Sequence, residues 1–329
     1  MSPKRKLTTS QLRRGDGVSD IDKIKQLKKK VARLESDNES MQRHVESARK
    51  ANQTTFLPKK KTRRLKDDWV RIVIGDGHGS SIDKTVAAVL LNDLKTIEAD
   101  EIVALGDMME CGGFLAQHFT MGYVAQTEYT YEADIAAANQ FFDKIMESCP
   151  KLKKFHYLEG NHEQRIEKWC VTQALRNKHD AEFLLRQIGT EHVLNLETRG
   201  VKYYKQVDYH DGVSIPGTIK LGNCFFTHGI TACKHAAANH AEKLGGNVVY
   251  GHTHRMDAWR TNTVSAGRIG AWSPGCLCKR QRMWHHTKPS MWSHGYLLQV
   301  VSRSGLFQTI PIEIENNQSM LAQFTRTFK

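Results

Sequence analysis

The chain has 329 residues, of which 40% are hydrophobic and 25% are charged, and its formal net charge is +13. This length and apolar content allow one large catalytic domain and an appendage. No apolar run approaches the roughly 18 residues that a membrane-spanning helix needs, and no apolar signal core follows the basic start, so we expect a cytoplasmic protein without a membrane span.

The excess positive charge lies at the N-terminal end. Residues 1–66 hold 20 Lys and Arg against 7 Asp and Glu, whereas the remaining residues hold 28 of each kind. We therefore predict a basic N-terminal tail over 1–66, ahead of a formally neutral domain. The like charges at 1–14 and 58–66 repel one another and cannot form a core, so both stretches are expected to be flexible.

A heptad pattern runs through the middle of this tail. The seam positions, at alternating spacings of three and four, are Ile24, Leu27, Val31, Leu34, Asn38, Met41 and Val45. The pattern predicts a short helix over about 21–49. It is either a homo-oligomeric coiled coil, in which Asn38 would help to determine register, or a lone and partly frayed helix.

The compact domain is expected over 67–314, followed by a flexible C-terminal end at 315–329. Short β-rich runs that end in polar residues predict strands in 69–76, 101–107, 153–161, 224–229 and 247–254. Helical segments separate most of them, for example at 82–98 and 131–149. This alternation indicates an α/β fold with sites at the strand ends. Residues 295–314 predict an antiparallel hairpin around Ser304 and Gly305.

Potential metal ligands follow all five predicted strands. They are Asp76, His78, Asp107, Asn161, His228, His252 and His254. Carboxylate, imidazole and amide ligands suit manganese, iron or zinc, and the lack of thiolates argues against a structural zinc finger. Seven ligands are too many for one tetrahedral ion, so we predict two divalent ions roughly 3.5–4 Å apart that share one carboxylate.

The ordered motifs GDGHG, GDMME, GNHE, THG and GHTH, over about residues 70–256, resemble those of the calcineurin-like metallophosphoesterases. The resemblance implies a four-layer sandwich, with two mixed β-sheets flanked by helices. It also implies two bound divalent ions, with manganese expected first and iron, zinc or magnesium as alternatives. By this resemblance Asp76, His78 and His254 would hold the first ion, Asn161, His228 and His252 would hold the second, and Asp107 would bridge them.

Two further residues are expected to act in catalysis. His162 looks like the family's catalytic histidine, which would give the leaving oxygen a proton or stabilise it electrostatically. Glu110 lies where many relatives carry an acidic partner, so it would orient this ring and raise its pKa, or else it is a solvated loop acid. Bound ions lower the pKa of water from about 15.7 towards about 7, which supplies hydroxide for attack on phosphorus.

The motifs narrow the substrate class. Serine/threonine protein phosphatases typically carry GDxVDRG and RGNHE, whereas this chain has GDMMECGG and EGNHE. The stretch from Ala271 to Val300 instead resembles phosphoesterases of bacteriophage and bacterial genomes, many of them described as DNA-repair exonuclease-like. A phage-encoded chain would act in the host cytoplasm.

The basic tail points to the same substrate. Lysines and arginines that neutralise phosphates release counterions, so the tail is suited to bind nucleic acid. The same charge would also serve solubility or attract RNA, an acidic membrane surface or a partner protein. We expect a phosphodiesterase of the DNA nuclease kind. A phosphomonoesterase for nucleotides or phosphoproteins is the alternative enzyme, and a binding module with a vestigial site is the alternative outside enzymes.

Three other stretches have weaker signals. In the loop 278–292, basic residues adjoin an aromatic cluster that could stack an unpaired base or simply cover the core: Lys279, Arg280, Arg282, Trp284, His285 and His286. Arg165 and Lys168 either face a phosphate or are helical surface charges. The insertion 163–227 could cap the site. The seven cysteines are expected to be reduced, with Cys276 and Cys278 buried as small apolar side chains.

Overall fold

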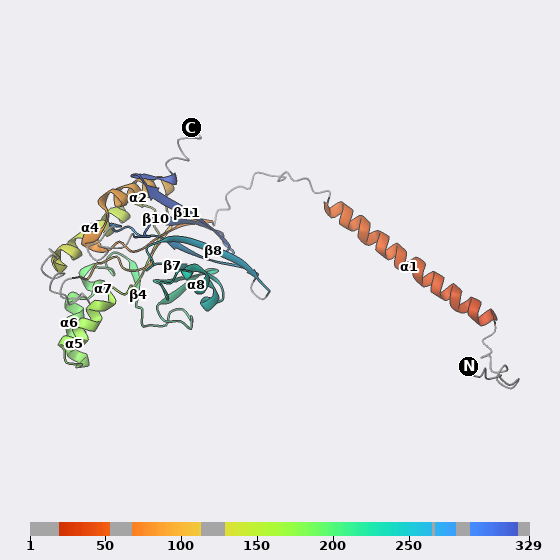
Figure 1. Ribbon diagram of the computed structural model, residues 1–329, viewed down its shortest axis with the longest axis horizontal. Helices are drawn as coiled ribbons and strands as arrows, with labels where there is room; N and C mark the ends of the chain where they lie inside the picture. Colours follow the sequence, from red (N-terminus) through yellow and green to blue (C-terminus); the bar gives the residue numbers. More distant parts are fainter. Residues whose placement is uncertain (1–19, 53–67, 113–128, 265–266, 281–289, 322–329) are drawn as a thin grey trace, which may run out of the picture. The chain divides into compact units, whose positions relative to one another are not determined.

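The computed structural model describes residues 20–52, 68–112, 129–264, 267–280 and 290–321 (Figure 1). The chain divides into two compact units, Met1–Arg63 and Arg64–Lys329, close to the boundary expected between residues 66 and 67. Among the helices in these ranges, none combines the length and apolar character needed to traverse a bilayer.

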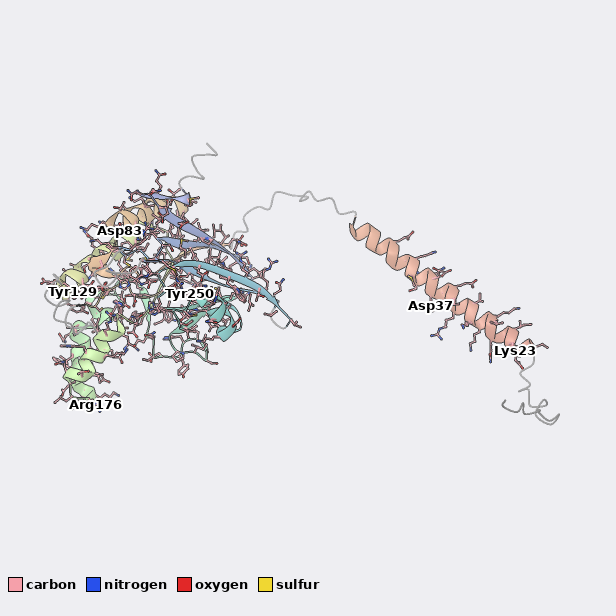
Figure 2. The ribbon with its side chains drawn as sticks, viewed as in Figure 1. Lys23, Asp37, Asp83, Tyr129, Arg176 and Tyr250 are labelled. Atoms are coloured by element: carbon pink, nitrogen blue, oxygen red, sulfur yellow. The ribbon has the colours of Figure 1, made fainter. Side chains whose placement is uncertain are left out.

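The described part of the first unit is the helix α1 (Asp20–Asn52), which includes the predicted heptad segment. All of its side chains from residue 21 to 43 are exposed to solvent. The apolar seam is therefore exposed too, with Leu27 61% and Leu34 58% accessible. Figure 2 shows side chains such as Lys23 and Asp37 projecting outward around the helix.

The second unit begins with a seven-stranded mixed sheet in the order β12-β11-β10-β1-β2-β3-β4. β1 to β4 run parallel, and β10 joins β1 in antiparallel fashion. The strands are β1 (Trp69–Ile74), β2 (Glu101–Ala104), β3 (Lys154–Leu158), β4 (Val201–Tyr204), β10 (Gly295–Val301), β11 (Phe307–Glu315) and β12 (Gln318–Ser319). Apart from Arg71 and Glu101, β1 and β2 consist of apolar residues, because both faces of these strands are covered.

A second mixed sheet has five strands in the order β5-β6-β7-β9-β8. β6, β7 and β9 are parallel, and the two edge strands are antiparallel to their neighbours. The strands are β5 (Thr218–Leu221), β6 (Cys224–Thr227), β7 (Asn247–Tyr250), β8 (Met256–Thr263) and β9 (Gly267–Pro274).

The two sheets pack face to face, with helices on their outer faces. Val73 and Leu105 of the first sheet meet Phe226 and Val249 of the second in one buried cluster. The helices are η1 (Gly79–Ser81), α2 (Lys84–Ile97), α4 (Tyr131–Ser148), α5 (Gln164–Gln173), α6 (Lys178–Ile188), α7 (Thr190–Val193) and α8 (Ala236–Leu244). α2 and α4 cover the first sheet, and α8 covers the second. The order helix, sheet, sheet, helix confirms the four-layer α/β architecture that the resemblance implies.

The C-terminal hairpin and the insertion are both part of the sandwich. The hairpin predicted in 295–314 is confirmed as β10 and β11. The sheet extends past the expected boundary at 314, however, because β12 pairs with β11 and Ser319 is fully buried. The segment 315–319 therefore belongs to the domain rather than to a flexible end. The insertion 163–227 supplies β4 and β5 to the edges of the two sheets, so part of it completes the sandwich.

Candidate metal centre

The seven predicted ligands all follow parallel strands, at the carboxyl ends of both sheets. Asp76 and His78 follow β1, Asp107 follows β2, Asn161 follows β3, His228 follows β6, and His252 and His254 follow β7. Because the sheets face each other, their strand ends bring these loops together. The site thus draws ligands from both sheets.

The loops have an unusual backbone conformation. Asp76, His78, Asp107, His252 and His254 all have positive φ angles, between 50° and 68°. Residues other than glycine rarely adopt this left-handed region, and they cluster in it at functional sites where surrounding contacts hold the strain. Five of the seven expected ligands are therefore directed by backbone geometry that the sequence pattern does not reveal.

Two glycines allow the loops to approach one another. Gly106 has φ +103°, and a Cβ there would come within 2.8 Å of both the Gly160 backbone and the His228 ring. A Cβ on Gly160 would collide with the Asp107 carboxylate and backbone nitrogen. Larger residues at either position would push the β2 and β3 loops apart, so these glycines are required by close approach.

The side chains converge into two overlapping groups. One consists of Asp76, His78, Asp107 and His254, and the other of Asp107, His228 and His252; within each group the ligand atoms lie within 4.8 Å of one another. In the first group, His254 Nε2 is 3.0 Å from Asp76 Oδ1 and 3.1 Å from His78 Nε2. In the second, His228 Nε2 is 3.3 Å from Asp107 Oδ2 and 2.9 Å from Asn161 Oδ1. Asp107 is common to both groups.

The tautomer of His228 is determined by a backbone contact. Its Nδ1 lies 2.9 Å from the carbonyl oxygen of Leu105, to which it can only donate. In a neutral ring the lone pair would then be on Nε2, the nitrogen that faces Asp107 and Asn161. An imidazole that donates one N–H to a carbonyl and presents the other nitrogen is the usual arrangement of a metal-ligating histidine.

Glu163, the last residue of the GNHE motif, supports the ligand loops, a role that the sequence does not predict. It is 1% exposed, and its carboxylate accepts hydrogen bonds from the backbone N–H groups of Asp107, Met109 and Gly160 at 2.9–3.0 Å. The Tyr157 hydroxyl donates a further bond of 2.6 Å. One side chain therefore ties the loop after β2 to the loop after β3. Burial, with the Asp107 carboxylate nearby, raises the pKa of Glu163 to about 7.

Asp134 has a similar supporting role from α4. This fully buried carboxylate accepts from the backbone N–H groups of Ser80, Glu110 and Cys111 and from the Tyr129 hydroxyl, at 3.0–3.2 Å. It therefore joins the loops that follow β1 and β2. The sequence contains no signal for this role, since Asp134 lies in the first turn of a helix, where an acidic residue is common.

His162 lies beside the ligand groups, in contact with Arg165. Its ring packs edge-on against His78, with ring centroids 4.4 Å apart, and its backbone N–H donates to Asp107 Oδ1 at 2.8 Å. The Arg165 guanidinium nitrogens lie 3.1 Å and 3.0 Å from the two ring nitrogens. Arg165 is thus part of this site. Lys168, on the same helix, is an exposed surface residue.

Glu110 differs from its expected role. Its carboxylate is 3.2 Å from His78 Nδ1 but 4.0 Å from His162 Nδ1, and the closest contact to the latter comes from the Glu110 backbone carbonyl at 2.5 Å. The residue is 5% exposed, so it is not a solvated loop acid. The pKa of His162 is lowered to about 4, first because burial disfavours the imidazolium and also because His78 and Arg165 lie nearby. The opposing effect of Glu110 is too small to raise it.

The carboxylates and imidazoles of the two groups shift one another's pKa values. Burial alone would raise the pKa of Asp107, but the imidazoles of His228, His162 and His78 bring it well below its usual range. Burial would lower the pKa values of His228 and His254, yet Asp107 raises the first to about 9 and Asp76 raises the second to about 10. His228 and His254 are therefore each paired with a buried carboxylate.

The donor set fits a pair of divalent cations. Hard carboxylate and borderline imidazole ligands suit manganese, iron and zinc alike, so the residues favour a divalent ion without selecting one.

Cys278 also lies near the first group, with its Sγ 3.8 Å from His254 Nδ1. It is fully buried, as is Cys276, in agreement with the prediction for both. Of the basic loop 278–292, Lys279 and Arg280 are described, and Arg280 pairs with Glu315 at 2.7 Å. Arg282, Trp284, His285 and His286 lie outside the described residues.

The five ordered motifs meet at the facing ends of two mixed sheets. This arrangement resembles the fold of the calcineurin-like metallophosphoesterases. No protein-family model matches the sequence, and no curated protein matches it.

Several solved structures match this chain at low identity. Vps29 from Entamoeba histolytica complexed with Zn²⁺ is 12% identical, with 76% of this chain and 95% of that chain covered and a TM-score of 0.38. Yfce, a phosphoesterase from E. coli, is 15% identical, with 73% and 98% covered and a TM-score of 0.32. The Pseudomonas putida nuclease MPE is 9% identical, with 73% and 87% covered and a TM-score of 0.28.

Proposed function

We propose that this chain is a two-metal phosphoesterase that hydrolyses phosphodiester bonds in nucleic acid. The observation that carries the proposal is the position of Asp107. Its carboxylate belongs to both ligand groups, with Oδ2 3.3 Å from His228 Nε2 and 4.0 Å from His78 Nε2. A carboxylate shared between two ligand sets is the arrangement of two-metal hydrolases.

In this proposal Asp76, His78 and His254 hold one ion, Asn161, His228 and His252 hold the other, and Asp107 bridges them. Manganese is the expected ion. When bound, the ions would lower the pKa of water to near neutrality and neutralise charge on the phosphoryl oxygens.

The protein's own residues would perform the remaining steps. His162 would stabilise the leaving oxygen electrostatically or, once protonated at Nε2, give it a proton, and Arg165 would contact that ring from α5. Glu163 and Asp134 would preserve the spacing of the ligand loops. Glu110 would orient His78 through its 3.2 Å contact rather than acting on His162.

The basic N-terminal unit supports nucleic acid as the substrate. Lys23, Lys25, Lys28, Lys29, Lys30 and Arg33 all lie exposed on α1. These cations can neutralise backbone phosphates, and the released counterions make such binding strongly salt-dependent. Binding to single- or double-stranded DNA should fall steeply with salt, and deletion of residues 1–66 should abolish that dependence. Equal DNA affinity in the deletion variant would contradict this part of the proposal.

We further propose that α1 pairs with a second copy of itself. Its exposed apolar seam follows the heptad spacing, and Asn38 lies at an a position, where a polar residue specifies register. Leu27→Asp with Leu34→Asp should convert the oligomer to a monomer in light-scattering measurements of mass. Lys29→Asp, a matched change outside the seam, should leave the mass unchanged.

One set of assays tests the enzymatic proposal. The manganese-loaded protein is compared on bis(p-nitrophenyl) phosphate, p-nitrophenyl phosphate, and single- and double-stranded DNA. We expect turnover of the diester and of DNA. Turnover of p-nitrophenyl phosphate alone would show the phosphomonoesterase instead, and inactivity on every substrate with both ions bound would refute the enzyme.

A further inference from the structure

A cavity of about 420 Å³ lies at the end of the domain opposite to the metal centre. Its wall includes Asn247, the first residue of β7, whereas the ligand His252 follows the other end of that strand. Five residues of extended chain span roughly 16 Å. The rest of the wall comes from Asn223 in the turn between β5 and β6, from the β8–β9 hairpin and from the start of β11; the hairpin and β11 lie side by side at this end (Figure 1). The cavity is therefore separate from the candidate metal centre.

The wall of this cavity has an uncompensated positive charge. Arg260 of β8 and Arg268 of β9 both line it, and no Asp or Glu does. Neither arginine forms an ion pair with another described residue; the Arg260 guanidinium instead lies 5.4 Å from the Trp272 ring centroid. Two guanidinium groups that converge without a carboxylate favour an anionic ligand, and phosphate matches their planar donor geometry.

Trp272 contributes aromatic surface to the wall. This residue lines the cavity and is 5% exposed, and its indole nitrogen is itself buried. A ligand in the cavity therefore meets the indole ring rather than its N–H.

The wall also offers apolar and aromatic surface. The Phe307 ring meets the Trp272 ring edge-on, with centroids 5.8 Å apart, and Leu306 beside it is 67% exposed. Aromatic and guanidinium surfaces stack on the planar rings of nucleobases. The volume lies in the range of about 300–1,000 Å³ that is typical of small-molecule sites.

We propose that this cavity binds a mononucleotide-sized molecule that carries a phosphoryl group and a planar ring. Arg260 and Arg268 bind the phosphoryl group, and the ring packs against the aromatic wall formed by Trp272 and Phe307. The site is a second one, since it shares no residue with the metal centre. Its occupancy does not depend on the proposed phosphoesterase activity.

The indole N–H resonance of Trp272 reports on this site, because the Trp272 ring lines the cavity and a ligand ring packed against it would shift the resonance. In proton–nitrogen correlation spectra of the full chain, its resonance is assigned by its loss in Trp272→Phe. The probes are adenosine 5′-monophosphate and its phosphonate analogue, in which carbon replaces the ester oxygen so that the metal centre cannot cleave it. Adenosine and inorganic phosphate are titrated separately. We expect the nucleotide and its analogue to shift this resonance at lower concentrations than either fragment does.

Paired variants make the test specific. Arg260→Gln with Arg268→Gln should weaken the nucleotide-induced shift of the Trp272 resonance by about tenfold or more, because two charge-assisted contacts are lost. Arg176→Gln is the matched control, since this exposed arginine, labelled in Figure 2, lies just beyond the end of α5, outside the cavity wall. A resonance that does not move, or that moves equally in the double variant, would overturn the proposal. Inorganic phosphate binding as tightly as the nucleotide would overturn the ring contact.

Discussion

Both ends of the parallel strands β1, β2 and β3 bury charged side chains, but the partners of these charges differ between the two ends. At the amino-terminal end, Arg71 is 1% exposed and donates to Glu101 at 2.6 Å and to Gln299 at 3.1 Å. Trp69 and His156 bring the remaining donors to the same carboxylate, at 2.9 Å and 3.1 Å. This cluster contains its own cation, and its hydrogen bonds are matched within the chain.

At the carboxyl-terminal end, buried carboxylates predominate over basic side chains. Asp76, Asp107, Glu110 and Glu163 are all buried within a few residues of the histidine ligands, and Arg165 is the nearby basic side chain. The backbone there adopts positive φ angles, whereas the amino-terminal cluster lies on regular strand. Burial of charge alone therefore does not indicate function. A convergent set of carboxylates and imidazoles on strained loops is the more informative sign.

The largest expected effect comes from the shared carboxylate. Asp107→Asn removes the charge that both ligand groups use, so turnover should fall by about 10⁴-fold, the equivalent of several kcal/mol of transition-state stabilisation. Elemental analysis should show fewer than two ions per chain. Full activity with one ion per chain would contradict the bridging role.

His162→Gln should separate turnover from metal binding. The ring contacts the leaving-group side of the site in our proposal but is not a ligand. Turnover on a substrate with a poor leaving group should therefore fall by about 10²–10³-fold, while two ions remain bound. Unchanged turnover on that substrate would refute the assignment.

Glu163→Gln tests whether the Glu163 carboxylate holds the ligand loops in position for metal binding. The variant places an amide group where three backbone N–H groups need an acceptor, so the loops after β2 and β3 should loosen. Metal affinity should weaken by about 10–100-fold, as is usual for residues that position ligands. Glu167→Gln, one turn along α5 from this position, is the matched control and should bind metal normally, as measured by titration calorimetry.

At the amino-terminal end, Glu101→Gln should lower stability without touching the metal centre. Removing one partner of a buried ion pair costs about 3 kcal/mol or more, and urea unfolding measures this loss. Glu98→Gln breaks the exposed pair with Lys151 and should cost less than about 1 kcal/mol.

The acid dependence of unfolding should change in the same variant. Burial alone would raise the pKa of Glu101, but His156, Arg71 and Trp69 lower it from 4.5 to about 2. A carboxyl group whose pKa is lower in the folded than in the unfolded state stabilises the protein at pH values above the unfolded-state pKa. This contribution is lost as pH falls from about 4.5 through about 2. The variant should lack this component. An identical acid slope in both proteins would contradict the role of Glu101.

The smallest expected effect is the stabilisation of the folded protein by added metal. This effect should depend on the carboxyl-terminal end of the strands and not on the amino-terminal end. At about one hundred times the dissociation constant, manganese should stabilise the native protein by about 2.7 kcal/mol, seen as a higher Tm. Asp107→Asn should lose this shift and Glu101→Gln should keep it. A metal-dependent shift that survives Asp107→Asn would place the ions elsewhere.

The sequence by itself determined the local features of this protein. Heptad spacing defined α1, apolar runs located the central strands, and the ordered motifs identified the seven ligand candidates, because these patterns depend only on neighbouring residues. The supporting carboxylates Glu163 and Asp134, the contact of Arg165 with His162 and the preference of Glu110 for His78 were decided by the tertiary structure. The contacts that the two carboxylates make join residues up to 56 positions apart, which meet only when the strands align. The same reason explains why β12 extends the domain beyond residue 314, since its partner strand has to be in place before it can pair.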